Sequence, residues 1–325
     1  MNATQVSYLI FGIVLVVALI FDLGLISKKN TTVTIKKALF QTLFWVGLSL
    51  LFCGFLFFED GSMVATKYFT AYLMEWSLSI DNIFVFILIF SFFKVTEKDS
   101  PRVLLIGILL AIVLRILFIA IGIGIIERFH WILYFFGAFL IYTGYNLFFK
   151  KEDDEFDPGK SKLYKFIQKY LRFTEVEPQG RLTIKNHGKV YFTRLSVVVL
   201  MLAAIDVVFA LDSIPTVVSL VREKANVPFT TQDVLIIYSS NIFAVLGLRS
   251  LFFLLKGAVN QFSYLQQGIA VVLAFIGVKM LIEYFDIHIS IYISLLVIVA
   301  CLAVSIAYSI YQNRKTLSQN PDQLP

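Results

Sequence analysis

Two stretches of the chain decide its fold: EWSLSIDNIFVF at residues 75–86 and DVVFALDSIPTV at residues 206–217. Each has a carboxylate, five further residues, an Asp, a small polar residue and an Ile. The carboxylates of the first stretch, Glu75 and Asp81, correspond to Asp206 and Asp212 of the second. Carboxylates inside apolar runs of this kind are typical of membrane-spanning helices that carry a functional site.

The composition around these stretches indicates a membrane protein. Hydrophobic residues make up 58% of the 325 residues, charged residues only 15%, and the mean hydropathy is +0.82. Soluble domains carry about 25% charged residues, so this chain has too few to cover a wetted surface. The same numbers exclude a disordered chain, collagen, a coiled coil and a disulfide scaffold. Cys53 and Cys301 stand in apolar runs and are predicted to be core thiols.

Apolar runs long enough to cross a bilayer, about 20 residues each, predict an all-α bundle of about nine transmembrane helices. The runs cover residues 5–26, 38–58, 68–93, 103–126, 130–149, 195–221, 234–255, 262–285 and 287–310. With an external N-terminus, the cytoplasmic segments hold 21 of the 28 Lys and Arg residues, the opposite side holds 4, and the spans hold 3. Because basic residues favour the cytoplasmic side, we expect the N-terminus outside and the C-terminus in the cytoplasm.

The second half of the chain repeats the first. Arg115 and Arg249 lie in similar runs, LRILFI and LRSLFF, and Gly144 corresponds to Gly277. The offset between equivalent residues is 131 for the aspartates, 134 for the arginines and 133 for the glycines. Each unit has three helices, and an odd number of crossings means that the second unit enters the membrane from the opposite side. This predicts an inverted repeat, and transporters with such repeats bind their substrate near the midplane.

The expected segments follow from this repeat. They are two N-terminal helices (1–60), the first three-helix repeat (61–149), a cytoplasmic loop (150–194), the second repeat (195–286), and a last helix with a short tail (287–325). Within the loop, two β-prone runs flank Asn186-His187-Gly188 and predict a small hairpin, in which His187 is a turn residue rather than a ligand.

The four carboxylates and their polar neighbours predict a cation site. The candidate ligands are Glu75, Asp81, Asn82, Asp206, Asp212 and Ser213, with Arg115, Arg249 and Lys279 as supporting charges. An all-oxygen set suits hard divalent cations such as Mn²⁺, Mg²⁺ and Ca²⁺. The alternative is a set of internal salt bridges, and three cations cannot balance four carboxylates.

Helix geometry complicates this site. The two acids of each stretch are six positions apart, so they lie about 120° apart on a straight helix. A break at Pro215, which would free the carbonyl of Leu211, could bring both acids to one cavity. Asp22 and Asn241 are weaker candidates, the first because it lies near a helix end and the second because Asn often bonds neighbouring helices. No phosphate loop, catalytic triad, haem motif or nucleotide fingerprint is present, so we expect neither an enzyme nor a bound cofactor.

The chain resembles the TerC family, the tellurium-resistance protein C group of the LysE-like transporter superfamily. The segments that carry the resemblance are 75–86, Phe209-Ala-Leu-Asp212-Ser-Ile-Pro215, Ser240–Arg249 and residues 127–141. The resemblance implies a bacterial inner-membrane protein that exports metal ions, best supported for Mn²⁺, with the acidic motif residues essential. Two departures stand out: Ala203 replaces a Glu of many relatives, and the loop 222–232 is longer than usual.

Alternatives remain open. An exporter of small organic solutes such as amino acids could use Arg115 or Arg249 to bind a carboxylate. A membrane sensor or assembly protein could use the loop 150–194, and a channel would share the same sequence features. The expected partners are the lipid bilayer and the metal ion, with no nucleic acid; the preferred cation, the coupling ion, the oligomeric state and any cytoplasmic partner are left open.

Overall fold

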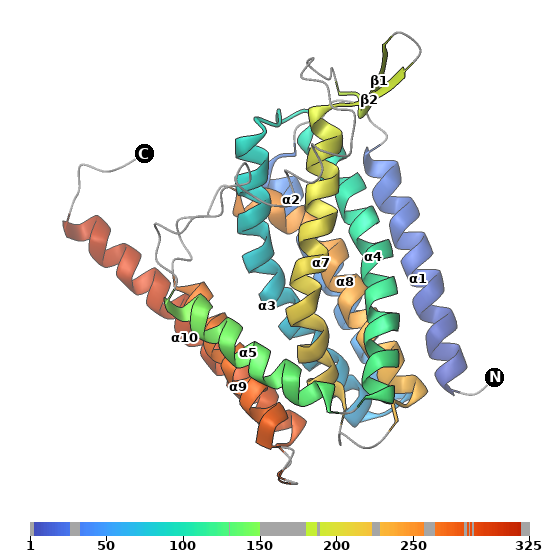
Figure 1. The fold of residues 1–325 in the computed structure, drawn as a ribbon, viewed down its shortest axis with the longest axis vertical. Coiled ribbons are helices and arrows are strands. Elements are labelled where there is room, and N and C mark those ends of the chain that lie inside the picture. The colour runs from blue at the N-terminus through green and yellow to red at the C-terminus, as the bar shows by residue number, and fades with distance from the viewer. Residues whose placement is uncertain are drawn as a thin grey trace.

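The structure is a computed structural model of the full chain. It describes residues 3–26, 33–129, 131–149, 180–186, 189–222, 228–256, 264–282, 285, 287 and 289–319. Within these ranges the chain is helical apart from one hairpin, as Figure 1 shows. Most of the expected loop 150–194, together with His187 and Gly188, lies outside the described residues.

The helices coincide with the apolar runs of the sequence. Their bounds are α1 (Ala3–Ile26), α2 (Ile35–Glu59), α3 (Ser62–Phe92), α4 (Ser100–Arg128), α5 (Ile132–Phe149), α7 (Arg194–Val221), α8 (Thr231–Leu255), α9 (Leu265–Ile282) and α10 (Ile291–Gln319). Six helical segments of the described residues are long and apolar enough to cross a membrane: Ile35–Glu59, Ser100–Arg128, Ile132–Phe149, Arg194–Leu211, Thr231–Leu255 and Tyr292–Gln312. The all-helical membrane architecture is therefore confirmed, while nine crossings remain a prediction.

The helix in which Pro215 suggested a break is continuous, and so is its counterpart α3. Helix α7 runs from Arg194 to Val221 with Pro215 inside it, and α3 runs without interruption from Ser62 to Phe92. The expected break at Pro215 is therefore wrong. Proline interrupts a helix in water, but within a membrane bundle neighbouring helices and small adjustments satisfy the freed backbone groups.

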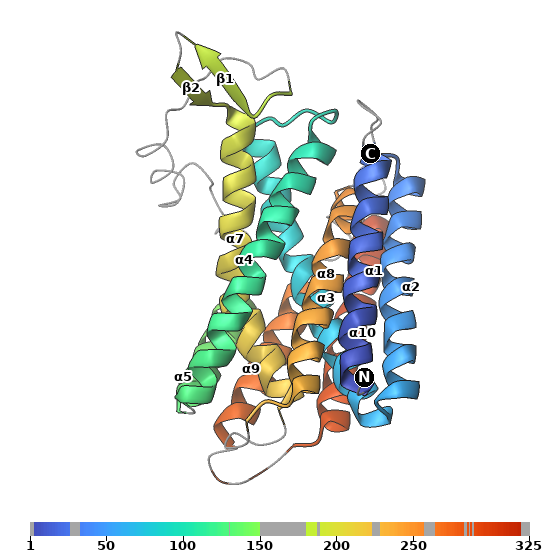
Figure 2. The ribbon, with the colours of Figure 1, turned by 90° about the vertical axis from the view of Figure 1, so that its right-hand side faces the viewer.

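Pairs of helices from the two halves of the chain form the centre of the bundle. The most extensive contacts join α3 to α8, α4 to α7 and α5 to α9. Helices α5, α9 and α10 are inclined to the others in Figure 1, and Figure 2 shows α1 and α2 along one side. Because the main partners lie far apart in sequence, the fold depends on contacts between the halves.

Three contacts show that α3 and α8 run in the same direction. Lys67 meets Asp233, Glu75 meets Asn241 and Phe90 meets Phe252. In the same way, residues 107, 115 and 122 of α4 approach residues 202, 206 and 214 of α7 in that order. The four helices therefore surround one central region that Glu75 and Asp206 both reach.

Glycine allows α5 and α9 to approach closely. A Cβ atom on Gly144 would lie 2.6 Å from the carbonyl oxygen of Ala270, and one on Gly277 would lie 2.5 Å from the carbonyl oxygen of Gly137. Small residues of this kind let helix backbones pack against each other in membranes. At these two positions hydrogen is the only side chain that fits.

We expect Gly144→Ala to destabilise the protein, because the new methyl group meets the Ala270 backbone, which cannot rotate away. Thermal unfolding of the purified protein measures the effect. Gly54→Ala is the matched control, since a Cβ atom at Gly54 on α2 meets nothing within 4 Å. Equal melting temperatures for the two variants would contradict the close crossing.

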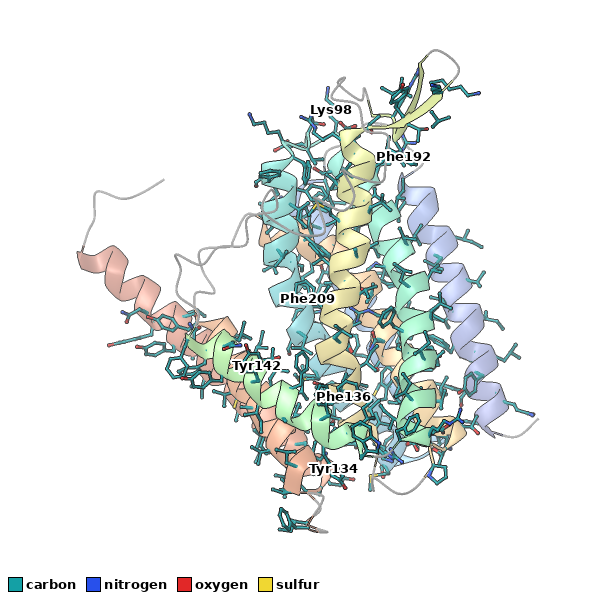
Figure 3. The ribbon with its side chains drawn as sticks, viewed as in Figure 1. Lys98, Tyr134, Phe136, Tyr142, Phe192 and Phe209 are labelled. Atoms are coloured by element: carbon teal, nitrogen blue, oxygen red, sulfur yellow. The ribbon has the colours of Figure 1, made fainter. Side chains whose placement is uncertain are left out.

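The hairpin lies at one end of the bundle. Strands β1 (Thr183–Asn186) and β2 (Lys189–Phe192) are antiparallel, with Asn186 opposite Lys189, as the sequence predicted. Arg102 Nη1 donates to the carbonyl oxygen of Gly180 at 2.9 Å and ties the hairpin to the start of α4. In Figure 3, Lys98 and Phe192 lie at this end and Tyr134 lies at the other.

Polar contacts close the opposite end, where α1 begins. Asp60 accepts hydrogen bonds from Ser7 Oγ at 2.7 Å and from Gln232 Nε2 at 2.8 Å. Lys67 forms a buried ion pair with Asp233 at 3.3 Å, and Asp233 also caps α8 by bonding Thr230. These contacts join α1, the α2–α3 turn and the start of α8.

Candidate functional site

An arginine lies at the centre of the bundle between the two halves of the chain. Arg115 of α4 donates from Nε and Nη2 to the two carboxylate oxygens of Asp206 on α7, at 3.0 and 2.8 Å. Its Nη1 donates to Glu75 Oε2 on α3 at 2.9 Å. All three side chains are at most 2% exposed. One guanidinium group therefore binds the first carboxylate of each repeated stretch.

Asn241 of α8 completes this cluster. Its Oδ1 accepts from Arg115 Nη1 at 2.6 Å, and its Nδ2 donates to Glu75 Oε1. The side chain is fully buried. A weak candidate in the sequence thus becomes a central residue, which we group with Glu75, Arg115 and Asp206 as the central cluster.

The members of the central cluster satisfy one another's hydrogen bonds. Removing a charge from water costs several kcal/mol per ion, and only good geometry with additional hydrogen bonds offsets the cost. The fork of Arg115 supplies that geometry to Asp206, and Asn241 satisfies the second oxygen of Glu75. Two carboxylates against one guanidinium leave the cluster with one negative charge. Its electrostatics therefore favour the approach of a cation.

Ser213 lies close to the cluster, and Asn82 lies on the same helix as Glu75. Both are buried, and the Ser213 side chain interacts with the Glu75 carboxylate. No described atom is placed in good hydrogen-bonding geometry with Ser213 Oγ. On a regular helix Asn82 lies about 20° from Glu75, since seven residues make almost two turns. The Ser213 hydroxyl therefore belongs to the surroundings of Glu75, and Asn82 shares only the helix face of that residue.

The motif aspartates follow the carboxylates of the cluster on the same two helices, α3 and α7. Asp212 directly precedes Ser213, which reaches Glu75. Asp81 lies on α3 between Glu75 and Phe86, and Phe86 lines the same small gap as Leu202 and Asp206. The side chains of Asp81 and Asp212 lie outside the described residues, so their role as ligands stays a prediction.

The supporting charges have different environments. Arg249 is 5% exposed and lies on α8, two turns after Asn241. Lys279 Nζ donates to the carbonyl oxygen of Ser219 near the end of α7 at 3.0 Å. Ala203 is buried one turn before Asp206. The Asp22 side chain lies outside the described part of the chain.

Sequence reasoning missed the pair Lys67–Asp233. Neither residue was among the predicted site residues, yet both are buried. One signal was present: Thr230 and Asp233 form a capping box, which marks the start of α8. The partner of Lys67, 166 residues away, leaves no local pattern.

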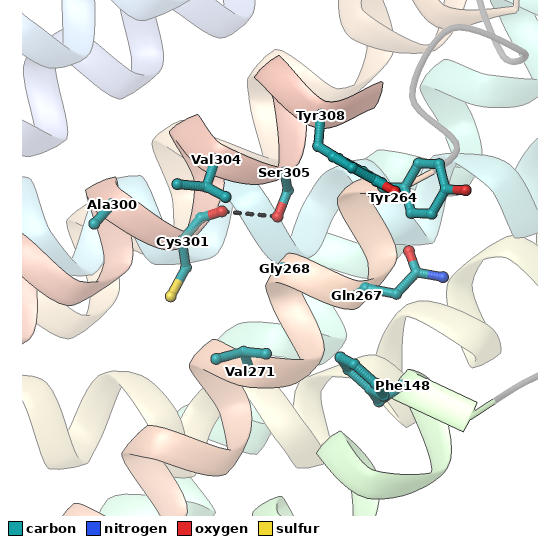
Figure 4. A pocket seen from close by; sticks show the side chains of 10 residues that line it. All are labelled: Phe148, Tyr264, Gln267, Gly268, Val271, Ala300, Cys301, Val304, Ser305 and Tyr308. Atoms are coloured by element: carbon teal, nitrogen blue, oxygen red, sulfur yellow. Dashed lines mark hydrogen bonds between the residues drawn. The ribbon is translucent and has the colours of Figure 1, made fainter. Parts of the chain in front are cut away.

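The described residues offer no second candidate site, either as a cluster of metal ligands or in the cavity beside α9 and α10. Among the residues whose side chains are described, no three His, Cys, Asp or Glu are close enough together to hold a metal ion. A cavity of about 390 Å³ lies beside α9 and α10, where Val271, Ala300, Val304 and Tyr308 line it. Figure 4 shows the hydrogen bond that Ser305 Oγ donates to the Cys301 carbonyl oxygen beside this cavity. None of the predicted ligands lines this cavity.

We expect Asn241→Ala to lower the free energy of unfolding by about 1–3 kcal/mol, the typical cost of leaving a buried polar partner unsatisfied. Glu75 Oε1 loses its donor in this variant. Ser240→Ala is the control, because Ser240 Oγ bonds only the nearby Ile237 carbonyl, at 3.4 Å, among the contacts found. Chemical unfolding followed by tryptophan fluorescence compares the two. Similar losses would show that Asn241 has no special place in the cluster.

The fold and the site together define an integral, multi-pass membrane protein with a buried charged centre. Residues 60–317 match the family model described as Integral membrane protein TerC family. The chain therefore belongs to the TerC family, as its motifs predicted.

Several bacterial relatives are similar along nearly the whole chain. An "Uncharacterized membrane protein" of Rickettsia felis is 40% identical over 304 residues, which cover 94% of this chain and 97% of the relative. Proteins of Salmonella typhi and Escherichia coli K12, each named "Putative membrane-bound redox modulator Alx", are 38% identical and cover 94% and 93% of this chain and 94% of each relative. No solved structure gives a significant match.

Proposed function

We propose that this protein is a secondary transporter that exports hard divalent cations, with Mn²⁺ as its main substrate. The observation that carries the proposal is the central cluster, a fully buried group with more carboxylate than guanidinium charge between repeated helices. Ionisable groups are costly inside a membrane and mark ion pathways there. Membership of the TerC family supports the same reading.

Charge arithmetic favours a cation. The two repeated stretches supply four carboxylates, and the buried Arg115, Arg249 and Lys279 supply three positive charges. The difference is one negative charge, and the all-oxygen ligand set suits a hard divalent ion. We propose Asp81 and Asp212 as the direct ligands, with Asn82 and Ser213 as neutral oxygen donors. Glu75 and Asp206, predicted as ligands, serve the Arg115 ion pairs when no metal is bound.

The contact pattern supports the inverted repeat. Gly144 and Gly277 are equivalent at an offset of 133 residues. The same offset relates Gly137 to Ala270, so the contact Gly137–Gly277 predicts an equivalent contact Ala270–Gly144, and both are found. The repeat also makes α3 equivalent to α7 and α4 equivalent to α8. The contact of α3 with α8 is therefore equivalent to the contact of α7 with α4, and both are extensive. A two-fold axis in the membrane plane, as in many secondary transporters, would produce this pattern.

We place the protein in the bacterial inner membrane with its N-terminus outside and its hairpin in the cytoplasm. The start of α1 and the hairpin lie at opposite ends of the bundle in Figures 1 and 2. The hairpin and the α3–α4 turn carry Lys94, Lys98, Arg102, Arg181, Lys185 and Lys189, which suits the positive-inside rule.

Cysteine labelling tests this orientation. In a background without Cys53 and Cys301, we expect Ser62→Cys to react with a membrane-impermeant maleimide added to intact cells. Lys185→Cys should react only after the membrane is opened, because it lies on the hairpin. Both native side chains are exposed, so access and not burial decides the outcome. Labelling of Lys185→Cys in intact cells would reverse the orientation.

The amino-acid alternative is weakened by the state of Arg115. An amino-acid carboxylate needs a guanidinium group with donors to offer, and Nε, Nη1 and Nη2 of Arg115 are all engaged by protein oxygens. The name of the Alx relatives refers to redox, but Cys53 and Cys301 are partly buried free thiols on different helices, α2 and α10. We therefore propose no enzymatic activity and no bound cofactor, with the bilayer and the metal ion as partners.

Flux in proteoliposomes tests the function. Purified protein is reconstituted, and uptake or release of Mn²⁺, Mg²⁺, Ca²⁺ and a mixture of amino acids is followed side by side. We expect Mn²⁺ flux above that of protein-free liposomes and no amino-acid flux. Amino-acid flux without metal flux would refute the proposal.

A further inference from the structure

The hold of Arg115 on its carboxylates raises a question about metal access. Both oxygens of Asp206 and one oxygen of Glu75 accept bonds from the guanidinium group, at 2.8–3.0 Å. These are the oxygens that a hard cation entering the centre would seek. In this structure a positive side chain already occupies them.

We infer that Arg115 is a tethered cation, which holds Glu75 and Asp206 while no metal is bound and gives way when a divalent ion enters. The inference rests on the proposed function and assigns one residue the regulation of that site. Glu75 and Asp206 are then not idle structural acids. They become available to the ion only as Arg115 releases them.

Electrostatics explains why the two cations exclude each other. Two like charges a few Å apart repel strongly in a buried site, and a divalent ion doubles the repulsion that a single charge would cause. An ion bound to Asp206 would lie within a few Å of the guanidinium group that now bonds the same carboxylate. The ion and Arg115 therefore compete for this position.

Asn241 gives the released guanidinium group a place to remain. Its Oδ1 is neutral and accepts from Arg115 Nη1 at 2.6 Å. A guanidinium group that keeps this bond can leave the two carboxylates without losing every partner. Asn241 is thus a positioning residue for the exchange, and its burial between α3 and α4 suits that role.

The decisive variant is Arg115→Met, which removes the competing charge but keeps a long side chain. We expect Mn²⁺ to bind this variant about tenfold more tightly than the wild type, because Glu75 and Asp206 are free, while Mn²⁺ flux falls to background because nothing displaces the ion. Calorimetry measures the affinity and proteoliposome flux the turnover. A merely structural Arg115 would lower both quantities.

The matched control is the double variant Arg115→Met/Asp206→Asn. It removes one cation and one anion, so the net charge is that of the wild type. The tighter binding should disappear, because it requires both carboxylates. If the double variant binds as tightly as Arg115→Met, loss of Arg115 acts through some other group and the inference fails.

Folding can be separated from exchange. Two buried carboxylates without a cation would destabilise metal-free Arg115→Met, so its melting temperature should rise far more with Mn²⁺ than that of the wild type. If Arg115→Met does not fold even with Mn²⁺, Arg115→Lys decides, since its ammonium lacks the planar fork and should hold the carboxylates less well. Unchanged or weaker Mn²⁺ affinity in Arg115→Lys would then overturn the inference.

The outcomes distinguish the inference from the proposed function. A wild-type protein that neither binds nor transports Mn²⁺ ends the proposed function. A wild-type protein that does both, together with a folded Arg115→Met that binds Mn²⁺ more weakly, leaves the proposed function intact and removes the tethered cation.

Discussion

An Asp81→Asn variant is expected to export Mn²⁺ at a rate close to background, and Asp212→Asn should behave alike. Asn preserves the size of the side chain but removes a full charge and a strong ligand, and the affinity of hard cations depends on the number of carboxylates. Accumulation of Mn²⁺ in cells that lack other exporters measures the effect, and those cells should become sensitive to the metal.

Each variant needs a check of its membrane level, because loss of a buried charge can also unfold a protein. Glu97→Gln is the matched control, since Glu97 is an exposed acid in the α3–α4 turn. It should export Mn²⁺ at the wild-type rate. Wild-type efflux from a well-expressed Asp81→Asn/Asp212→Asn double variant would end the metal-site hypothesis.

The second large effect concerns stability. Asp206→Ala removes the partner that binds Arg115 with two oxygens and leaves the guanidinium group, which is 2% exposed, with half of its bonds. Breaking a buried pair in this way costs about 3–5 kcal/mol. We expect a strong fall in the melting temperature and in the amount of protein recovered from membranes.

A double-mutant cycle separates the ion pair from other losses. Arg115→Met alone, Asp206→Ala alone and the combined variant are compared with the wild type. Because the combined variant removes both charges, it should lose less stability than the two single losses added together. Strict additivity would mean that Arg115 and Asp206 do not act as a pair.

The helices were predictable because each obeys a local rule. A run of about 20 apolar residues must bond its backbone internally in lipid, so α2, α4, α5, α8 and α10 follow from hydropathy alone. The hairpin followed from two β-prone runs around Asn186-His187-Gly188. These signals lie within the segments they describe.

The pairing of charges was less predictable. Sequence spacing identified Glu75, Asp206 and Arg115 as buried charges, but it offered both Arg115 and Arg249 as partners. It also ranked Asn241 low, although this residue bonds two members of the cluster. Such contacts join residues 40 to 166 positions apart and depend on how helices pack, which no local pattern records.

The helix break was mispredicted for a physical reason. Pro215 removes one backbone hydrogen bond, and a rule learned from water treats that loss as a break. Inside the bundle α7 remains helical on both sides of it. Helix α7 packs against α3, α4 and α8, and these contacts cannot be read from the sequence of α7 alone.

The bond between Arg115 and Glu75 also bears on biosynthesis. Both residues lie in the first half of the chain, whereas Asp206 and Asn241 are made later. An isolated charge at a helix centre costs about 2.5–3.5 kcal/mol on insertion. Glu75 and Arg115 can neutralise each other as soon as α3 and α4 have entered the membrane. The charges of the first half can therefore pair within the membrane before the second half is synthesised. Asp206 then binds an Arg115–Glu75 pair that has already formed.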